Sequence, residues 1–288
     1  MMMDHYETML DEFVRLGLTE DVGEGDHTSM ACIRPTRVSK AKLLIKDDGV
    51  ISGITVAKKI FKEVAPAAAF EQLLEDGTHV APGDIAFYVT CPTRVLLMAE
   101  RLVLNTMQHM SGISTLSALF AEEVEGLPVK ILDTRKTTPG MRFLEKEAVR
   151  LGGCYNYRSG LYDWIMIKDN HIDACGEIAL AIDQVHEYLK RIGKDLSITI
   201  EVRNLVELQK VLDKGGVTRI MMDNFEIPIL REAVAMVNGR FETEASGGIT
   251  LHNVRAYAET GVNYVSAGAL THSAGTLDMS LKIVYSEG

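Results

Sequence analysis

The sequence has few cysteines and no long apolar run. Its four cysteines form no CxxC pair and no zinc-type spacing, and a chain of 288 residues does not depend on a disulfide framework, so we expect free thiols. No stretch predicts a membrane span, and the first ten residues, "MMMDHYETML", carry acids where a signal peptide would carry basic residues. These absences predict a cytoplasmic protein without a membrane partner.

Positive charge is also scarce. The chain has 30 Lys and Arg residues against 40 Asp and Glu residues, which gives a formal net charge of −10. A broad nucleic-acid surface needs a basic face that displaces counterions from phosphates, so we expect no nucleic-acid partner. An anionic small molecule needs only a local basic pocket, which this composition allows.

The second half of the chain repeats one pattern, in which a short apolar run is followed by a polar turn and an amphipathic segment of helical spacing. Helical segments of this kind include "RFLEKEAVRL", "EIALAIDQVHEYLKRI" and "LVELQKVLDK". The predicted strands are residues 129–132, 164–167, 197–202, 219–222, 241–245 and 264–266. This alternation predicts a parallel α/β sheet and favours a closed TIM-like barrel, with a doubly wound sheet as the alternative.

The first third of the chain has a different pattern. The segments "SKAKLLIKDDGVISGI" and "DIAFYVTCPTRVLL" indicate strands of a separate sheet, and "TVAKKIFKEVA" indicates a helix across it. We therefore predict a small α+β domain over residues 1–98 and a barrel domain over residues 99–274. A helical stretch from residue 98 to about residue 125, broken near "SGIST", joins them. The final segment, 275–288, contains "LDMSLKIVYS", which is able to return to the first sheet as a strand.

Polar and charged residues follow the predicted strands of the second half. The chemistry of barrel enzymes gathers at the carboxyl ends of the strands, so these residues should meet on one rim. The segment "DTRKTTPG" follows the first strand and "KDNH" follows the second. The predicted rim residues are Asp133 to Lys136, Lys168 to His171, Glu201, Asp223, Asn224, Ser246 to Gly248 and Ser266 to Gly268, with Arg158 added by the turn "YNYRSG".

Four of these rim residues are cations, which would repel one another unless an anion binds between them. They are Arg135, Lys136, Arg158 and Lys168. The ligand should therefore be polyanionic. The turns "SGG" and "SAG" offer backbone N–H groups to a phosphate, and Glu201 and Asp223 suit a hydrated Mg²⁺ ion that also binds phosphate oxygens.

Each residue also has an ordinary structural use. Glu201 and Asp223 suit helix caps or salt bridges, and each glycine-rich turn suits a tight βα loop. His109, on the long helix, is expected to be packed or solvated, whereas His171 and His272 lie on the rim. The functional interpretation depends on the joint placement of the residues.

Several segments resemble successive motifs of the quinolinate phosphoribosyltransferase family, also called nicotinate-nucleotide pyrophosphorylase (carboxylating). They are "LTEDVGEGDHTS", "AERLVLNTMQHMSGIST", "ILDTRKTTPGMRFLEKEAVRLGG", "RSGLYDWIMIKDNH", "MMDN", "EASGGI" and "VSAGALTHS". The resemblance spans nearly the whole chain. It implies an N-terminal α+β open sandwich, a TIM-like barrel with fewer than eight strands, and a homodimer whose active sites lie between subunits.

The resemblance also implies roles for residues of this chain. The acceptor-site positions correspond to Thr134, Arg135, Lys136, Tyr157, Arg158 and Lys168, with Arg101 contributed in trans by the neighbouring subunit. The donor-site positions correspond to Glu201, Asp223, Ser246, Gly247, Gly248, Ser266, Ala267, Gly268 and His272. The expected catalytic residues are Lys136, Lys168, Glu201 and Asp223, of which the two acids are expected to hold Mg²⁺ through water.

Two positions depart from the family pattern. Tyr157 stands where the family commonly has a histidine between asparagine and arginine, so one imidazole is missing from the implied acceptor site. We expect the Tyr157 phenol to face the acceptor carboxylates in its place. Arg203 stands where a second acid is common, which bears on the metal or ribose contacts.

The implied reaction is the transfer of phosphoribose from phosphoribosyl pyrophosphate to quinolinate with decarboxylation, which gives nicotinate mononucleotide, pyrophosphate and carbon dioxide in NAD synthesis. Three alternatives stay open. They are transfer to another anionic acceptor, a Schiff-base barrel aldolase that uses Lys168, and a ligand-binding paralogue without catalysis.

Overall fold

The computed structural model describes residues 2–284, with side chains from residue 5 onward. The chain divides into two compact units. The first comprises the residues up to 118 together with 137–153 and those from 273, and the second comprises 119–136 and 154–272. The first unit is therefore assembled from three separate segments, and it extends well past the predicted boundary at residue 98.

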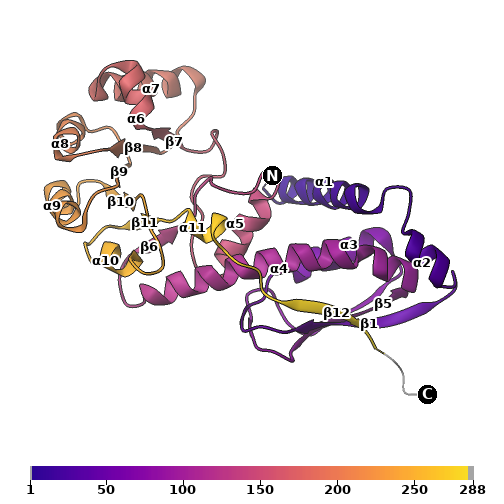
Figure 1. The fold of residues 1–288 in the computed structure, drawn as a ribbon. Coiled ribbons are helices and arrows are strands. Elements are labelled where there is room, and N and C mark those ends of the chain that lie inside the picture. The colour runs from indigo at the N-terminus through magenta and orange to yellow at the C-terminus, as the bar shows by residue number, and fades with distance from the viewer. Residues whose placement is uncertain (1, 285–288) are drawn as a thin grey trace. The chain divides into compact units, whose positions relative to one another are not determined.

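A four-stranded antiparallel sheet forms the centre of the first unit, in the order β12-β1-β5-β3 (Figure 1). Its strands are β1 (Val38–Ile45), β3 (Ala69–Gln72), β5 (Ile85–Pro92) and β12 (Met279–Ile283), and a separate pair joins β2 (Gly49–Val50) to β4 (His79–Val80). Alternate residues of β1 are buried, as expected for a strand with one face on the core. The predicted return of the C-terminal segment is confirmed by the pairing of β12 with β1, although residues 285 and 286 of that segment lie outside the described residues.

Helices α3 (Ile54–Val64) and α4 (Thr93–Glu123) run across this sheet (Figure 1). Two predictions about this region are wrong. The residues "TRVLL" begin α4 instead of continuing a strand, because Pro92 has no N–H to extend the ladder. Helix α4 also runs through "SGIST" unbroken, since Gly112 serves close packing there: a Cβ at Gly112 would collide with the carbonyl of Gly275.

The first unit also contains α1 (Met2–Val22), α2 (His27–Cys32) and α5 (Arg142–Leu151). Helix α5 follows the first barrel strand in sequence but packs in the first unit, where Phe143 lies edge to face with Tyr6 and Phe13 of α1, at centroid distances of 5.4 and 6.2 Å. All four cysteines are free thiols, as expected. Within residues 2–284, no helix is both long and apolar enough to cross a bilayer.

The second unit is a parallel sheet of six strands in the order β6-β11-β10-β9-β8-β7. The strands are β6 (Lys130–Leu132), β7 (Ile165–Ile167), β8 (Ile198–Val202), β9 (Arg219–Asp223), β10 (Glu242–Ser246) and β11 (Tyr264–Ser266), each within about two residues of its prediction. This order is cyclic, because the first strand pairs with the last, and it is the order of a barrel with fewer than eight strands. Among the described residues, the ring is open only between β6 and β7, where Tyr155 adds a parallel bridge to Leu132.

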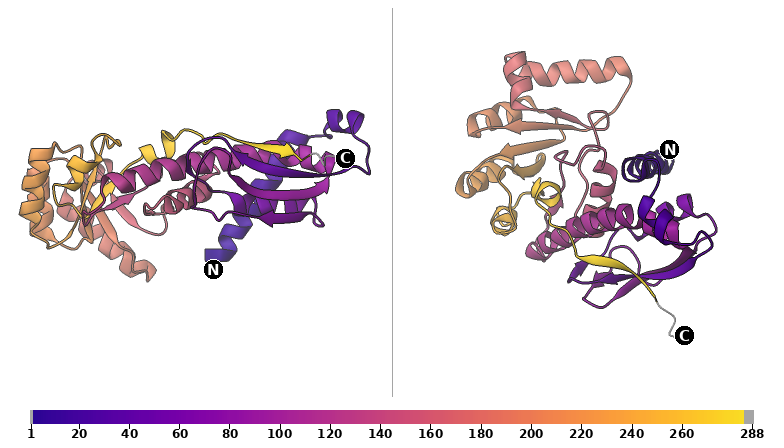
Figure 2. Two further views of the ribbon diagram at one scale, coloured as in Figure 1. Left: turned by 90° about the horizontal axis from the view of Figure 1, so that it is seen from below. Right: turned by 45° about the vertical axis from the view of Figure 1, so that its right-hand side comes forward.

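Helices follow the strands and lie on the outer side of this curved sheet (Figure 2). They are α6 (Asp169–Cys175), α7 (Ile178–Ile192), α8 (Leu205–Lys214), α9 (Ile227–Val237) and α10 (Val254–Ala258). The short α11 (Ala269–His272) instead lies beside the loop that follows β6, where Thr271 bonds to Lys136. The apolar stripes of the outer helices cover the sheet: Leu208 and Val211 of α8, for example, are fully buried. The second unit is thus an α/β barrel whose strand ends carry the predicted rim residues.

Candidate functional site

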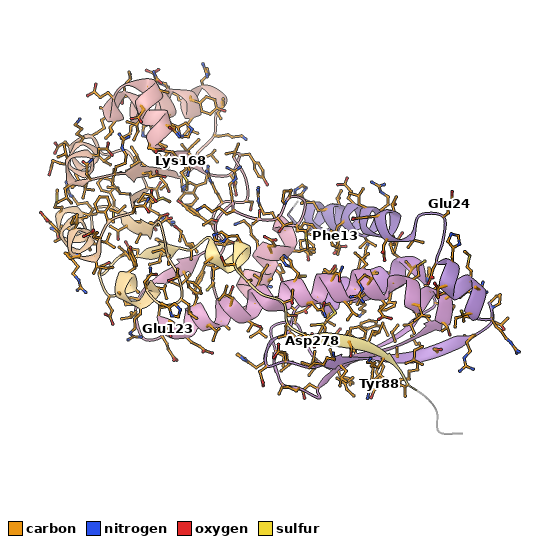
Figure 3. The ribbon with its side chains drawn as sticks, viewed as in Figure 1. Phe13, Glu24, Tyr88, Glu123, Lys168 and Asp278 are labelled. Carbon is orange, nitrogen blue, oxygen red and sulfur yellow. The ribbon has the colours of Figure 1, made fainter. Side chains whose placement is uncertain are left out.

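The six parallel strands of the second unit end in polar residues. Lys168 directly follows β7 at the start of α6 (Figure 3), and Glu201 and Asp223 lie at the ends of β8 and β9. Because the carboxyl ends of parallel strands meet at one edge, the structure brings the predicted rim residues of this unit to one end of the barrel.

Lys168, Glu201 and Asp223 form one electrostatic group. The Nζ atom of Lys168 lies 3.7 Å from Oε2 of Glu201, which is 7% exposed. Burial raises the pKa of Glu201, and the negative charge of Asp223 raises it further, while Lys168 opposes the rise. Two carboxylates that disfavour each other's charge are suited to a shared cation.

The two acids suit a hydrated Mg²⁺ ion better than a metal ion whose ligands all come from the protein. Within the described residues, no group of three or more His, Cys, Asp or Glu side chains is arranged to hold a metal ion. Mg²⁺ commonly uses one or two carboxylates and takes its other ligands from water and substrate phosphates. Glu201 and Asp223 would hold such an ion, which would neutralise charge on a phosphorylated ligand.

Two arginines, Arg135 and Arg158, lie close together at the rim. Burial lowers the pKa of Arg158, and the positive charge of Arg135 lowers it further. The Nε atom of Arg135 is buried and has no hydrogen-bond partner in the part of the chain that the structure describes. Neighbouring guanidinium groups with an unused buried donor are suited to an anion with more than one carboxylate or phosphate oxygen.

Glycines shape the two loops that follow β10 and β11, which are adjacent strands. Gly247 has φ 97°, and a Cβ there would collide with the side-chain oxygen of Asn224. A Cβ at Gly268 would lie 3.0 Å from Cδ of Lys136 and 3.0 Å from Nε2 of His272. The structure therefore places Lys136 and His272 beside the second loop, in a region where backbone N–H groups can approach a phosphate.

The "DTRK" loop is held by residues whose roles were not predicted. Asp133 is fully buried and accepts a hydrogen bond from the backbone N–H of Tyr157 at 2.8 Å, and the Thr271 hydroxyl donates to the carbonyl of Lys136 at 2.8 Å. Thr134 accepts from the N–H of Lys136 at 3.0 Å. An acid directly after a buried strand was the available sequence signal for Asp133, whereas nothing in the sequence indicated Thr271.

The Tyr157 side chain makes a contact that the sequence did not predict. Its hydroxyl lies 2.7 Å from Oγ1 of Thr199 in β8, and burial raises its pKa well above the ordinary value, with the Glu244 carboxylate adding to the rise. Thr199 and Glu201 point to the same face of β8, so the phenol lies one layer below the rim, inside the barrel.

Three further residues have clear placements. Arg203 pairs with Glu207 at 2.6 Å and with Asp173 at 3.1 Å, so its guanidinium is taken by acids of α8 and α6. Arg101 lies exposed on α4, in the first unit. His109 is hydrogen-bonded to the buried Glu145 at 2.9 Å, which confirms that it is packed.

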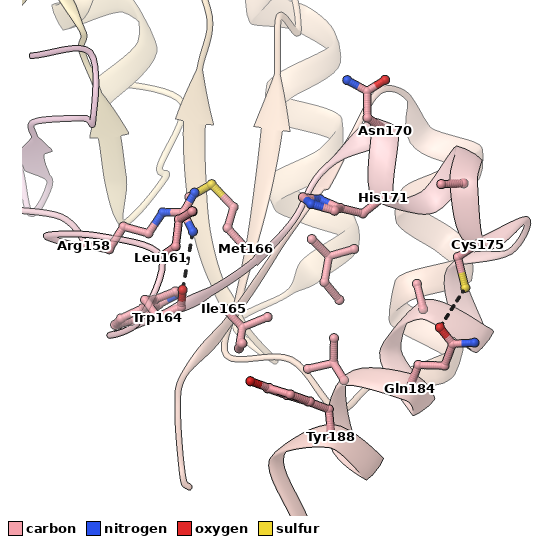
Figure 4. Close-up of a pocket in the computed structure, with 14 residues that line it drawn as sticks. Arg158, Leu161, Trp164, Ile165, Met166, Asn170, His171, Cys175, Gln184 and Tyr188 are labelled. Carbon is pink, nitrogen blue, oxygen red and sulfur yellow. Dashed lines mark hydrogen bonds between the residues drawn. The ribbon is translucent and has the colours of Figure 1, made fainter. Parts of the chain in front are cut away.

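A pocket of about 570 Å³ lies beside β7, the end strand of the sheet (Figure 4). Arg158 and Trp164 line one side and His171 the other, with Met166 between them. Arg158 donates a hydrogen bond to the carbonyl of Trp164 at 3.4 Å. The pocket therefore shares the Arg158 side chain with the rim, and its remaining wall is mostly apolar.

Comparison with known proteins matches both parts of this chain. Residues 26–111 match the N-terminal domain of quinolinate phosphoribosyl transferase, and residues 113–282 match its C-terminal domain. A quinolinate phosphoribosyltransferase [decarboxylating] 1 of Nicotiana glauca is 44% identical over 94% of this chain and 81% of its own length. A nicotinate-nucleotide pyrophosphorylase [carboxylating] of Arabidopsis thaliana, named as chloroplastic, is 43% identical over 95% of this chain and 82% of its own. The crystal structure of NadC from Streptococcus pyogenes has a TM-score of 0.91 at 35% identity and covers 96% of this chain and 97% of that one.

Fold, rim and sequence therefore agree, and the chain belongs to the quinolinate phosphoribosyltransferase family.

Proposed function

We propose that this protein transfers phosphoribose from phosphoribosyl pyrophosphate to quinolinate with decarboxylation and so forms nicotinate mononucleotide for NAD synthesis. The observation that carries the proposal is the pair of neighbouring guanidinium groups at Arg135 and Arg158, with the buried Nε of Arg135 unpartnered among the described residues. Two carboxylates on one flat ring supply the charge and the planar acceptors that this pair needs.

The acceptor would be held by cations from three loops. Arg135 and Lys136 come from the loop after β6, Arg158 from the segment before β7, and Lys168 from the start of α6. Thr134 fixes the backbone of Lys136 in this arrangement. A monocarboxylate would leave part of this charge unbalanced, so we expect nicotinate to be a poor acceptor.

The donor would occupy the other side of the rim. Its 5-phosphate would take the two glycine loops, formed by Ser246, Gly247 and Gly248 and by Ser266, Ala267 and Gly268, with His272 beside them. Glu201 and Asp223 would face the ribose and the Mg²⁺-pyrophosphate.

The reaction follows from this placement without a covalent enzyme intermediate. The ring nitrogen of quinolinate attacks C1 of the ribose as the bond to pyrophosphate breaks, and the electron pair leaves with pyrophosphate. Positive charge that develops on the ribose is stabilised by Glu201 and Asp223, and the basic residues help to neutralise the leaving group. The quaternised ring then releases its 2-carboxylate as carbon dioxide, and the carbanion at C2 takes up a proton to give nicotinate mononucleotide.

Lys168 does not have the surroundings that Schiff-base chemistry uses. Its side chain is 48% exposed and forms a salt bridge with Glu201, whereas a Schiff-base lysine works as a neutral amine in an apolar pocket or beside another cation. Borohydride treatment in the presence of aldehyde or ketone substrates should therefore leave Lys168 unmodified.

The proposed function is tested by turnover. Purified protein is incubated with phosphoribosyl pyrophosphate, Mg²⁺ and either quinolinate or nicotinate, and nicotinate mononucleotide and carbon dioxide are measured. We expect turnover with quinolinate that EDTA abolishes and excess Mg²⁺ restores. Equal turnover of nicotinate would contradict recognition of a dianion, and no turnover with quinolinate would favour another anionic acceptor or a ligand-binding paralogue.

We also propose a homodimer in which Arg101 completes the acceptor site of the neighbouring subunit. Arg101 is exposed on α4 and has a charge that suits the same dianion. Mixing inactive Arg101→Ala protein with inactive Lys136→Ala protein should restore activity, because one of the two sites in a mixed dimer has both residues. Absence of recovery after confirmed subunit exchange would place Arg101 outside the shared site. Cytoplasmic localisation stays a prediction, since the Arabidopsis relative is named as chloroplastic.

A further inference from the structure

The hydroxyl of Thr199 joins two aromatic residues inside the barrel. Trp164 donates from its indole Nε1 to Oγ1 of Thr199 at 2.9 Å, and the hydroxyl of Tyr157 lies 2.7 Å from the same oxygen. Thr199 is fully buried, and the two rings meet edge to face at a centroid distance of 5.8 Å. One side chain of β8 therefore holds two residues that are seven positions apart in the sequence.

The direction of the hydrogen bonds in this group is constrained. Indole N–H can only donate, so Thr199 must accept from Trp164, and its own hydrogen is free to point to Tyr157. Among side chains of similar size, only serine also has a single oxygen atom that both accepts and donates a hydrogen bond. Valine has the shape of threonine but would leave the indole N–H and the phenol without this partner.

The segment between the two rings carries Arg158. Tyr157 precedes Arg158 in the chain, and Arg158 Nη1 donates to the carbonyl of Trp164 at 3.4 Å. The middle of the segment is also tied, because Asp163 accepts from the N–H groups of Ser159 at 2.7 Å and Gly160 at 3.1 Å. Fixing Tyr157 and Trp164 to the barrel therefore fixes both ends of the loop that presents Arg158.

The buried guanidinium of Arg219 packs over both rings. The Arg219 guanidinium carbon lies 5.1 Å from the centroid of Tyr157 and 5.2 Å from that of Trp164, and Arg219 is paired with Glu244 at 3.1 Å. Thr199 is opposite Arg219 in the register of β8 and β9. The rings are thus held at their polar atoms by the Thr199 hydroxyl and over their faces by the Arg219 guanidinium.

We infer that Thr199 is a positioning residue for the acceptor: through Tyr157 and Trp164 it sets the loop that presents Arg158 to the substrate carboxylates. The inference rests on the proposed function, because Arg158 is an acceptor residue only if quinolinate is the acceptor. It also gives Tyr157 a role inside the barrel, since its hydroxyl reaches Thr199.

The kinetic test compares three variants. Thr199→Val removes the shared hydroxyl and keeps the shape, and Thr199→Ser restores the hydroxyl. Tyr157→Phe keeps the Trp164 bond but removes the bonds of the phenol to Thr199 and Glu244. We expect Thr199→Val to raise KM for quinolinate about three- to tenfold with little change in KM for phosphoribosyl pyrophosphate, Tyr157→Phe to act in the same direction, and Thr199→Ser to lie near the wild type. An unchanged KM for quinolinate in Thr199→Val would overturn the inference.

Thr243→Val is the matched control. Thr243 is buried in β10 of the same sheet, and its hydroxyl also makes two hydrogen bonds, to the side chain and backbone N–H of Asn263 at 3.0 and 3.1 Å. It faces away from the interior residues Glu242 and Glu244. Loss of stability alone should affect both Val variants, whereas a rise of KM for quinolinate confined to Thr199→Val supports positioning. An equal rise in Thr243→Val would assign the effect to general destabilisation.

Trp164 provides a readout that does not depend on catalysis. It is the single tryptophan of the chain, so intrinsic fluorescence reports the Thr199 bond directly. We expect the emission of Thr199→Val to shift to shorter wavelength, because the indole loses its hydrogen-bond partner, and that of Thr199→Ser to match the wild type. Identical emission in all three proteins would show that the bond is not formed. If the emission shifts but the wild type does not turn over quinolinate, the Thr199 contact is supported and the proposed substrate is wrong.

Discussion

The backbone N–H of Lys168 donates a hydrogen bond to Nδ1 of His171, 2.9 Å away, and the backbone N–H of His171 returns one to the carbonyl of Lys168 at 2.9 Å. This reciprocal pair starts α6 at the residue whose side chain reaches Glu201. His171 must keep Nδ1 unprotonated to accept, so its ring is fixed in one orientation beside the rim.

Replacing His171 should therefore affect Lys168. We expect His171→Leu to raise KM for quinolinate roughly fivefold, the effect of losing about 1 kcal/mol of one hydrogen bond. His171→Gln should retain most of the affinity, because glutamine at this helix position can accept from the same N–H. Steady-state kinetics with both substrates checks this; equal effects of Leu and Gln would mean that the ring acts through the pocket wall and not through the backbone of Lys168.

Protonation of Glu145 should lower the stability of the folded protein at acid pH. Burial alone would raise its pKa, but hydrogen bonds from His109 and from the N–H of Thr138 outweigh burial and hold the pKa below its usual value. A carboxyl with a lowered folded-state pKa stabilises the protein fully above its unfolded-state pKa of about 4.3, and this contribution is lost as the pH falls through the folded-state value.

The Glu145→Gln variant should therefore lose about 1 to 3 kcal/mol of unfolding free energy at pH 7 and less at pH 3. Urea denaturation at several pH values measures the difference. Glu147→Gln, on the same helix, removes an exposed pair with Arg150 and should cost less than about 1 kcal/mol. A pH-independent cost for Glu145→Gln would show that only packing is lost.

Gly247 should be needed for the donor. Its φ of 97° and the position of Asn224 leave no room for a Cβ, so Gly247→Ala must move the first glycine loop. We expect KM for phosphoribosyl pyrophosphate to rise about tenfold or more, as for the loss of a hydrogen bond to a charged phosphate. Gly239→Ala is the control, since Gly239 has φ 70° with no atom within 4 Å of an added Cβ. It should cost stability of about 1 kcal/mol and leave both KM values unchanged.

The Arg219–Glu244 pair should show the asymmetry of buried charges. Arg219 is 5% exposed and Glu244 fully buried, so Arg219→Met would leave a carboxylate inside the barrel without its main cation and destabilise by about 3 to 5 kcal/mol. The double variant Arg219→Met with Glu244→Leu should recover part of that loss. Arg203→Met removes the pairs of an exposed guanidinium with Asp173 and Glu207 and should cost less than Arg219→Met. Denaturant unfolding of the wild type, the two single variants and the double variant measures these differences. A double variant less stable than Arg219→Met would contradict the prediction.

The sequence predicted the barrel strands because most are short apolar or β-branched runs bounded by turns, although β10 carries Glu242 and Glu244. The cyclic pairing follows from their number and order. It did not predict that α4 continues through Gly112, since the reason is the carbonyl of Gly275, far away in the chain. It also placed α5 in the barrel series, because helical periodicity does not report which sheet a helix covers.

The same limit applies to the site. Charged residues after strands could be assigned to the rim, as Lys168 and Glu201 show. The inward turn of Tyr157 could not, because it depends on where Thr199 and Trp164 lie in three dimensions. Resemblance indicated which position departs from its family, and the contacts of the phenol explain how the departure is accommodated.

The pairing of β12 with β1 has a consequence for synthesis on the ribosome. β1 spans Val38–Ile45, but one of its two neighbours is Met279–Ile283, which follows all six barrel strands in sequence. The first sheet therefore cannot be completed until every barrel strand has been translated, and one edge of β1 stays unpaired while the barrel residues emerge. Open strand edges are templates for pairing with other chains, so this edge is exposed to such pairing during that interval.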